Sequence, residues 1–526
     1  MKKLSYIVVY LLICCTLPVY GINPERSSVI SDNQTYLRDI ADNRVKETIA
    51  LRSSESFKNQ VDARYNGKSN TLYIIESFFD LKGESIVLPP RVELLFIKGR
   101  IENGGLEGKN TLVSSECDII FRNVSFKGTW KANRPRPEWF GADGNDMNDD
   151  TYALKSLAKF SGYSLFDKNM VYYVNDYIFL KSNIEWNLNG SIIKLSQNKS
   201  FSLYISQAEN VIIRNGSIEG YRIGPSDCLE YGITIDASND IIVENVFFSL
   251  FSRDGIYVGY EWSDSNEESH KTENILIKDC VFDNVARNGV TISAGEDVEV
   301  SHCLFKNINT TYPKSGIDIE PESINKTKYL NLNNILIHDC SFEDCRLAIS
   351  VYQSNCNYQC GNVYIKDIEC NNSILYIENI KKDCGFNTFV SRASFVGCKE
   401  EGVRIVNPCI GVKTQLSKLH IKQIDSMSNP RKTSAIVLYA NGERADLGGV
   451  KIDGLKVDDT SYEYMISISH NQDKTPGKLQ NISLKHISKR KELNGNAILL
   501  AEEDVLDKES FKARKAIKKK TQFITD

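Results

Sequence analysis

Three carboxylates stand at alternate positions of the segment GIDIEPES, residues 316–323: Asp318, Glu320 and Glu322. In an extended chain, alternate side chains point to opposite faces, so the acids share one face and the two isoleucines between them share the other. Neighbouring carboxyl groups repel each other as anions, which raises the proton affinity of one and leaves another ionised. This arrangement suits general acid–base chemistry, and the alternative is an exposed strand face whose acids only prevent aggregation.

The segment belongs to a set of repeated strand-like phrases. One phrase is seen as GITID, GIYVG, GVTIS and GIDIE, and a second as NILIKDCVF and NILIHDCSF. Constant phrases at unequal spacing indicate the coils of one solenoid, with loops of different length inserted between strands. The intervening segments are short and rich in Asn, Asp, Ser and Gly, so they leave little room for helices. We therefore predict an all-β chain, a right-handed parallel β-helix (solenoid).

Stacking of the coils predicts which side chains surround the acids. The second and fourth residues of each GIDIE-like phrase face the core, so the first, third and fifth face outward and form columns with a spacing of roughly 4.8 Å. These columns bring Asp318 and Glu320 near a third catalytic candidate, Asp254, and near the candidate substrate-binding residues Arg287, Asn288, Tyr257, Glu322 and Tyr352. Because the acids face outward, we expect Asp318→Asn and Glu320→Gln to remove activity and to leave stability nearly unchanged.

The mixture of acids, an arginine, an amide and tyrosines suits a polysaccharide. Sugar rings stack on aromatic faces, and sugar hydroxyls need planar hydrogen-bond partners. We expect loops 264–273 and 309–315 to wall the site. Asp254 lies two coils from Asp318, roughly 10 Å along the axis, whereas Asp318 and Glu320 lie side by side. The long separation suits hydrolysis with inversion of configuration and the short one suits retention, so the stereochemical outcome stays open.

Cysteines mark the interior of the solenoid. Five residues share one inward position of the second phrase: Val246, Cys280, Cys303, Cys340 and Ile368. Cysteine is among the most buried residue types, so these positions predict a buried ladder. Cys356 and Cys360 differ because they lie in a loop, CNYQC, where a local disulfide is chemically allowed. No metal or other cofactor is expected.

The 526 residues carry a net charge of −4, which does not favour a nucleic-acid partner. The start, MKKLSYIVVYLLICCTLPVYG, has basic residues and a short apolar run typical of a signal peptide, and no later stretch is a candidate membrane span. We expect a secreted or periplasmic protein; a lipoprotein that uses Cys14 or Cys15 is the alternative, opposed by the bulky Ile13. The predicted parts are a signal peptide 1–21, a polar segment 22–60, an N-terminal β region 61–136, the β-helix 137–500 and a basic tail 501–526. The oligomeric state stays open.

The segment PEWFGADGNDMNDDTYALKSLAKF, 137–160, resembles the opening motif of the pectin-lyase-like superfamily. In that motif a Phe-Gly-Ala strand and a turn lead to an Asp-Asp-Thr helix start, here Asp149, Asp150 and Thr151, with Asp150 as the expected cap of a short helix. The preceding β region looks like that of exported Bacteroidetes proteins. The superfamily includes polygalacturonases, pectate lyases, epimerases, tailspikes and proteins without known activity, so the resemblance bears on fold more than on activity.

Signatures of particular activities are missing from the sequence. The Asn-x-Asp, Asp-Asp and Gly-His-Gly pattern of polygalacturonases is not clearly present, nor are the calcium and arginine signatures of pectate lyases. The resemblance and the acids together predict a secreted carbohydrate-active protein, a glycoside hydrolase acting on a complex or acidic polysaccharide. The alternatives are a polysaccharide lyase and a non-catalytic glycan-binding or surface protein.

Overall fold

The computed structural model describes most of the chain from residue 47 onward. The described ranges are 47–221, 228–259, 271–321, 332–353, 360–379, 385–398, 401–407, 411–422, 434–440, 446–458, 464–470, 478–480, 482–489, 498–500, 521 and 523–525. The predicted signal peptide, Glu322, Cys356 and most of the basic tail lie outside these ranges, and so does most of loop 264–273.

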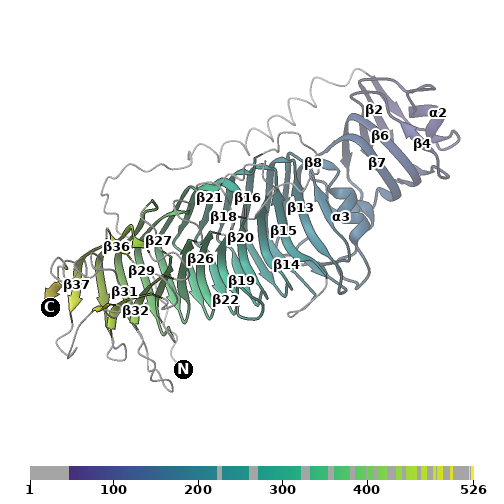
Figure 1. Cartoon of the computed structure of the whole chain (residues 1–526). Coiled ribbons are helices and arrows are strands. Elements are labelled where there is room, and N and C mark those ends of the chain that lie inside the picture. Colours follow the sequence, from purple (N-terminus) through teal and green to yellow (C-terminus); the bar gives the residue numbers. More distant parts are fainter. Residues whose placement is uncertain are drawn as a thin grey trace, which may run out of the picture.

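Parallel strands stack along one axis, as the prediction of a parallel β-helix requires (Figure 1). The N-terminal strands are β1 (Glu47–Ala50), β2 (Thr71–Ile75), β3 (Phe78–Asp80), β4 (Ser85–Val87), β5 (Glu93–Phe96), β6 (Arg100–Ser115) and β7 (Phe121–Ala132). They join the longer solenoid without a break in pairing, because β7 pairs in parallel with β8 (Phe160–Leu165). The N-terminal β region therefore extends the same kind of stacking.

The large sheet continues through the solenoid. Its remaining strands are β9 (Val171–Val174), β11 (Ile184–Asn187), β12 (Ile192–Leu195), β14 (Glu209–Glu219), β16 (Asn239–Ser249), β18 (Glu273–Lys278), β19 (Val281–Asp283), β21 (Gly295–Ser301), β22 (Leu304–Lys306), β24 (Leu332–His338), β25 (Ser341–Glu343), β27 (Asn362–Asn371), β29 (Asn387–Val396), β31 (Thr414–Lys422), β34 (Val450–Val457), β37 (Ser483–Lys489) and β39 (Phe523–Thr525).

A second sheet carries the GIDIE-like phrases. Its strands, in spatial order, are β10 (Ile178–Leu180), β13 (Phe201–Ser206), β15 (Glu230–Asp236), β17 (Asp254–Gly259), β20 (Asn288–Ile292), β23 (Ser315–Ile319), β26 (Leu347–Gln353), β28 (Ile374–Asn379), β30 (Val403–Val406), β32 (Ser434–Ala440), β35 (Tyr464–His470) and β38 (Ile498–Leu500). Two further short strands, β33 (Asp446–Gly448) and β36 (Lys478–Gln480), pair with each other. The order of the second sheet follows the chain, so each coil contributes one strand to it.

The core lies between the sheets and is built from the inward positions of both phrases. The isoleucines and valines at positions two and four are fully buried, as Ile317 and Ile319 are. Phenylalanines of the second phrase add a ladder in which rings stack at centroid distances of 4.9 Å (Phe248 and Phe282), 4.8 Å (Phe282 and Phe305) and 5.0 Å (Phe305 and Phe342). The two-residue alternation of a strand thus explains the core directly.

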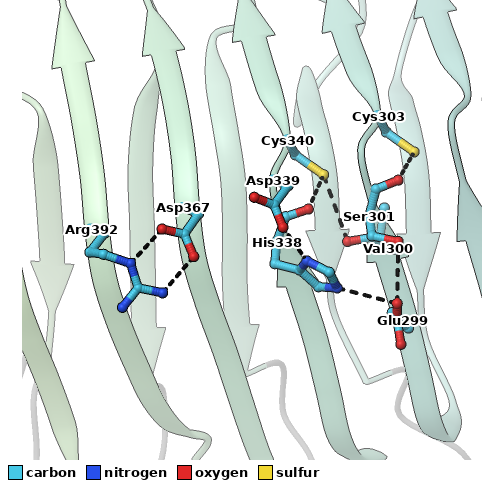
Figure 2. Close-up of polar contacts among 9 residues, drawn as sticks. All are labelled: Glu299, Val300, Ser301, Cys303, His338, Asp339, Cys340, Asp367 and Arg392. Carbon is cyan, nitrogen blue, oxygen red and sulfur yellow. Dashed lines mark hydrogen bonds and ion pairs between the residues drawn. The ribbon is translucent and has the colours of Figure 1, made fainter. Parts of the chain in front are cut away.

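The predicted cysteine ladder is confirmed. Cys280, Cys303 and Cys340 are buried at the same position of successive coils, and each thiol lies 3.2 Å from the carbonyl oxygen two residues before it. Figure 2 shows this contact for Cys303 and Cys340. Burial is the main cause that raises the pKa of the Cys303 thiol well above its ordinary value. These thiols therefore act as small core side chains.

The predicted short helix is present, but its cap differs from the expectation. Helix α3 (Thr151–Leu157) begins after Asp150, whose carboxylate accepts from the backbone N–H groups of Asp143 and Tyr173 and bonds to no N–H of the helix. The carboxylate of Asp149 accepts from the N–H of Thr151 at 3.0 Å instead. The side-chain bond to the helix start thus comes from Asp149, one residue earlier than expected, because the Asp150 carboxylate holds Asp143 and Tyr173. The other described helical segments are α2 (Phe57–Val61) and the 3-10 turn η2 (Pro137–Phe140).

Candidate functional site

A pocket of about 790 Å³ lies on the outer face of the second sheet, beside strands β23, β26, β28 and β30. The strands contribute Asp318, Glu320, Ser350, Tyr352, Tyr376 and Arg404, and the segment before β23 contributes Asn309, Tyr312, Pro313 and Lys314. Arg346 and Leu347 at the start of β26 complete one wall. The expected wall from loop 309–315 is therefore present.

The strand register confirms the predicted outward column. Successive pairs run Thr291 to Asp318, Asp318 to Ser350, Ser350 to Tyr376 and Tyr376 to Arg404. The expectation that this face is exposed is wrong at its centre, since Asp318 is only 2% exposed. Asp318 lines the pocket together with residues of the loop before β23, so it does not lie on an open strand face.

Burial changes the acid–base properties of Asp318. Loss of solvent raises the pKa of its carboxyl to about 7, and the nearby Glu320 carboxylate acts in the same direction. A hydrogen bond with Ser350 and the charge of Arg287 act in the opposite direction. The Nδ2 group of Asn288 donates to Asp318 Oδ2 at 3.2 Å. Asp318 thus exchanges its proton near neutral pH, and Glu320 lies two residues further along the chain, directly after β23.

Asp254 occupies a different environment, behind the pocket. Its side chain is fully buried, and Arg287 donates to both of its carboxylate oxygens, from Nε at 2.7 Å and from the terminal nitrogen at 2.6 Å. Thr291 Oγ1 donates to Asp254 Oδ2 at 2.9 Å. Asp254 does not line the pocket. Its oxygens are held by these donors, so its contacts are those of a positioning group.

Asn288 links this ion pair to the acid in the pocket. Its Nδ2 group lies 2.9 Å from Thr291 Oγ1 and 3.2 Å from Asp318 Oδ2, and its Oδ1 atom accepts from the backbone N–H of Ser315 at 3.1 Å. Asn288 is fully buried. A continuous network of polar side chains therefore spans three coils and fixes the orientation of the Asp318 carboxyl.

Aromatic and cationic side chains form the rest of the pocket. Tyr352 is half-buried, and burial together with the nearby carboxylates raises the pKa of its hydroxyl. The hydroxyl of Tyr376 donates to Glu378, and burial and this bond raise the pKa of Tyr376. At the rim, the guanidinium of Arg346 lies 4.4 Å from the centre of the Tyr312 ring. The pocket thus combines ring faces, acids and cations.

Six of the eight sequence-predicted residues belong to the pocket or to the network that contacts Asp318: Asp318, Glu320, Tyr352, Asn288, Arg287 and Asp254. Asp254 lies farther back, and Tyr257, 8% exposed, packs beside Tyr231 with ring centroids 5.6 Å apart. Glu322 lies outside the described residues. The sequence analysis did not assign Tyr376 to the site, although ILYIE repeats the apolar alternation of the other phrases. Arg346 and Tyr312 lie outside the phrases and carry no such signal.

The described residues offer neither a metal-binding cluster nor a membrane-spanning helix. Among them, no group of three or more His, Cys, Asp or Glu side chains is arranged to hold a metal ion. Over the same part of the chain, no helix has the length and apolar character needed to cross a membrane.

Comparison with known proteins bears on the fold. Residues 159–331 match the family described as "Right handed beta helix region". The chain is a right-handed parallel β-helix protein. Together with the parallel coils, this match confirms the resemblance to the pectin-lyase-like superfamily. The narrower resemblance to exported Bacteroidetes proteins stays a prediction.

Two curated relatives come from Bacillus subtilis (strain 168). The β-helix protein is 28% identical over 200 residues to the uncharacterized protein YclG. The aligned region covers 35% of this chain and 33% of YclG. It is 27% identical over 215 residues to the SPbeta prophage-derived uncharacterized protein YorA. This aligned region covers 38% of this chain and 35% of YorA. The chain therefore matches about a third of the length of each. Among solved structures, the mannuronan C-5 epimerase AlgE4 A-module of Azotobacter vinelandii is 13% identical with a TM-score of 0.46, covering 69% of this chain and 96% of that module.

Proposed function

We propose that this β-helix protein is a glycoside hydrolase that cleaves a polysaccharide in the pocket around Asp318. The observation that carries the proposal is one carboxyl, 2% exposed and with its pKa raised to about 7, that lines a pocket beside a second carboxylate. Glycoside hydrolysis uses such a pair, one acid protonated and the other ionised. A strand face that only needed solubility would not bury one of its acids.

In this proposal Asp318 is the general acid. Its neutral carboxyl donates a proton to the glycosidic oxygen as the bond to the leaving sugar breaks. Glu320 then acts as the ionised partner, either as a base that activates water or as a nucleophile. Asn288 and Ser350 hold the Asp318 carboxyl in place, and the buried pair of Arg287 and Asp254 supports them from behind.

The lining of the pocket supports an acidic polysaccharide as the substrate. Tyr352 and Tyr376 offer ring faces for sugars, and Lys314, Arg346 and Arg404 line the same pocket. Cations at the rim favour a substrate that carries carboxylate or sulfate groups. Secretion through the signal peptide 1–21 belongs to the same proposal, since such polymers lie outside the cell.

The direct experiment is a screen of acidic and neutral glycans with the purified protein. A hydrolase releases reducing ends without new ultraviolet absorbance, whereas a lyase releases reducing ends together with an unsaturated, absorbing product. A glycan-binding protein gives neither signal but retains the polymer in affinity electrophoresis. We expect release of reducing ends without a rise in ultraviolet absorbance. Absorbance that grows with the reducing ends would show that the protein is a lyase and not a hydrolase.

A further inference from the structure

A second feature of the same sheet face lies far from the pocket, at strands β10 and β13. Three aromatic rings gather there: the centroids of Tyr177 and Phe179 are 6.3 Å apart, those of Phe179 and Tyr204 are 5.2 Å apart, and those of Tyr177 and Tyr204 are 6.4 Å apart. Phe179 is 55% exposed. We call these three residues the aromatic platform. A strand that exposes a phenylalanine presents a surface suited to binding.

The strand register connects the aromatic platform to the pocket. The pairs run from Phe179 to Tyr204, Thr234, Tyr257, Thr291 and finally Asp318. The platform and the acid therefore occupy the same outward column, five strands apart, which at about 4.8 Å per strand is about 24 Å. Only a chain of several sugar units reaches from one to the other. Thr234, Tyr257 and Thr291, which lie between them in this column, are only 6%, 8% and 3% exposed, so a polymer that reaches both sites passes over this covered stretch and does not lie on the column itself.

Polar groups beside the rings match those of the pocket in kind. The hydroxyl of Tyr204 donates to Asp236 Oδ2 at 2.9 Å, which holds that ring in one orientation. Lys181, two residues after Phe179, is exposed, and Lys155 pairs with Asp176 at 2.5 Å. Burial lowers the pKa of Lys159, and the charges of Lys181 and Lys155 lower it further. Acids and lysines thus both surround the ring faces of the platform, and the exposed Lys181 directly follows β10.

We propose that Tyr177, Phe179 and Tyr204 form a distal binding site for the same acidic polysaccharide that enters the pocket, about five coils from the acid. The inference rests on the proposed function for its ligand. Sugar rings stack on the exposed face of Phe179, and lysines beside it attract the negative groups of the polymer. The protein then prefers long chains over short ones and holds them in extended form along the solenoid.

The test compares Tyr177→Ala, Phe179→Ala with its parent, both made in the inactive background Asp318→Asn, Glu320→Gln. The matched control is Tyr364→Ala in the same background, because Tyr364 is 37% exposed and stacks on Phe389 at 5.2 Å in the other sheet. The probes are polygalacturonate and polymannuronate, each as polymer and as trisaccharide. Dissociation constants are measured by calorimetry and affinity electrophoresis.

We expect the Tyr177→Ala, Phe179→Ala change to weaken binding of one polymer by about tenfold. Its trisaccharide and the Tyr364→Ala control should show no change. Equal polymer binding by the variant and its parent would overturn the proposal, as would a parent that binds neither polymer. If the parent protein is a dimer and the Tyr177→Ala, Phe179→Ala change dissociates it, the rings belong to an interface between copies, which would overturn the proposal. If polymer binding depends on Phe179 but the protein with Asp318 and Glu320 intact releases no reducing ends, the distal binding site is supported and the hydrolase function is refuted.

Discussion

Replacing Asp318 by asparagine should stabilise the protein at neutral pH while it removes activity. The sequence-based expectation of nearly unchanged stability assumed an exposed acid and does not hold for this buried one. The folded-state pKa of about 7 lies above the ordinary 3.8, so between these values the folded protein holds a proton that the unfolded chain has lost. The free energy of unfolding therefore decreases as the pH rises through this window. The difference between the two pKa values corresponds to on the order of 4 kcal/mol.

Asparagine carries no charge, so Asp318→Asn avoids this cost, and its carbonyl oxygen accepts the same hydrogen bond from Asn288. We expect the variant to be more stable than the wild-type protein at pH 8 by roughly 1 to 4 kcal/mol, and equally stable near pH 4. Urea unfolding followed by circular dichroism at both pH values measures the difference. Equal stability at both pH values, or a variant less stable at pH 8, would refute the argument that burial raises the proton affinity of Asp318.

Three further changes test other parts of the structure. Asp254→Asn should lower the free energy of unfolding by about 3 kcal/mol, because it leaves the guanidinium of Arg287 without its buried partner; a loss below about 0.5 kcal/mol in urea unfolding would contradict this. His338 Nε2 donates to Glu299 Oε1 at 3.2 Å, and this bond raises the pKa of His338. The stabilising effect of the bond is therefore present below pH ~6.5 and is lost as the pH rises through the folded-state value. His338→Gln should accordingly lower the free energy of unfolding by about 0.5 kcal/mol at pH 5 and leave it unchanged at pH 9. The same loss at both pH values in urea unfolding would assign the effect to packing and not to charge. The buried Cys303 thiol should react with a thiol reagent only when the protein unfolds, whereas fast labelling of the folded protein would contradict the ladder.

The sequence predicted the coils well because their signal is periodic. Alternation over five residues fixes which side chains face the core, and repetition over many coils leaves one consistent register. The contacts of His338 with Glu299 and Asp339, and that of Arg392 with Asp367, lie on the outer side of the large sheet (Figure 2). They fall at the two polar residues that the phrase inserts between inward positions, where Asp339, Asp367 and Arg392 have left-handed backbone (φ 53–54°) and interrupt the alternation. Strand periodicity therefore carries over directly into three dimensions.

The burial of Asp318 was not predictable from the same signal. Alternation says that the side chain leaves the core, but it says nothing about what covers the outer face. The segment before β23 and Arg346 line the pocket with Asp318, and neither follows the repeat. For the same reason the sequence did not separate Asp254, which Arg287 neutralises, from Asp318, which lines the pocket. The partner of an outward side chain comes from another coil, at a register that only the folded chain specifies.

The decisive measurement for catalysis by Asp318 and Glu320 is reducing-end release by the Asp318→Asn, Glu320→Gln double variant. Both changes keep the shape of the side chains, and urea unfolding shows that the variant is folded. General acid–base catalysis contributes roughly a hundredfold to ten-thousandfold in rate, so the account predicts at least a hundredfold loss on any polysaccharide that the wild-type protein cleaves, with Glu244→Gln on the other sheet as an active control. Turnover at the wild-type rate by the folded double variant would contradict it.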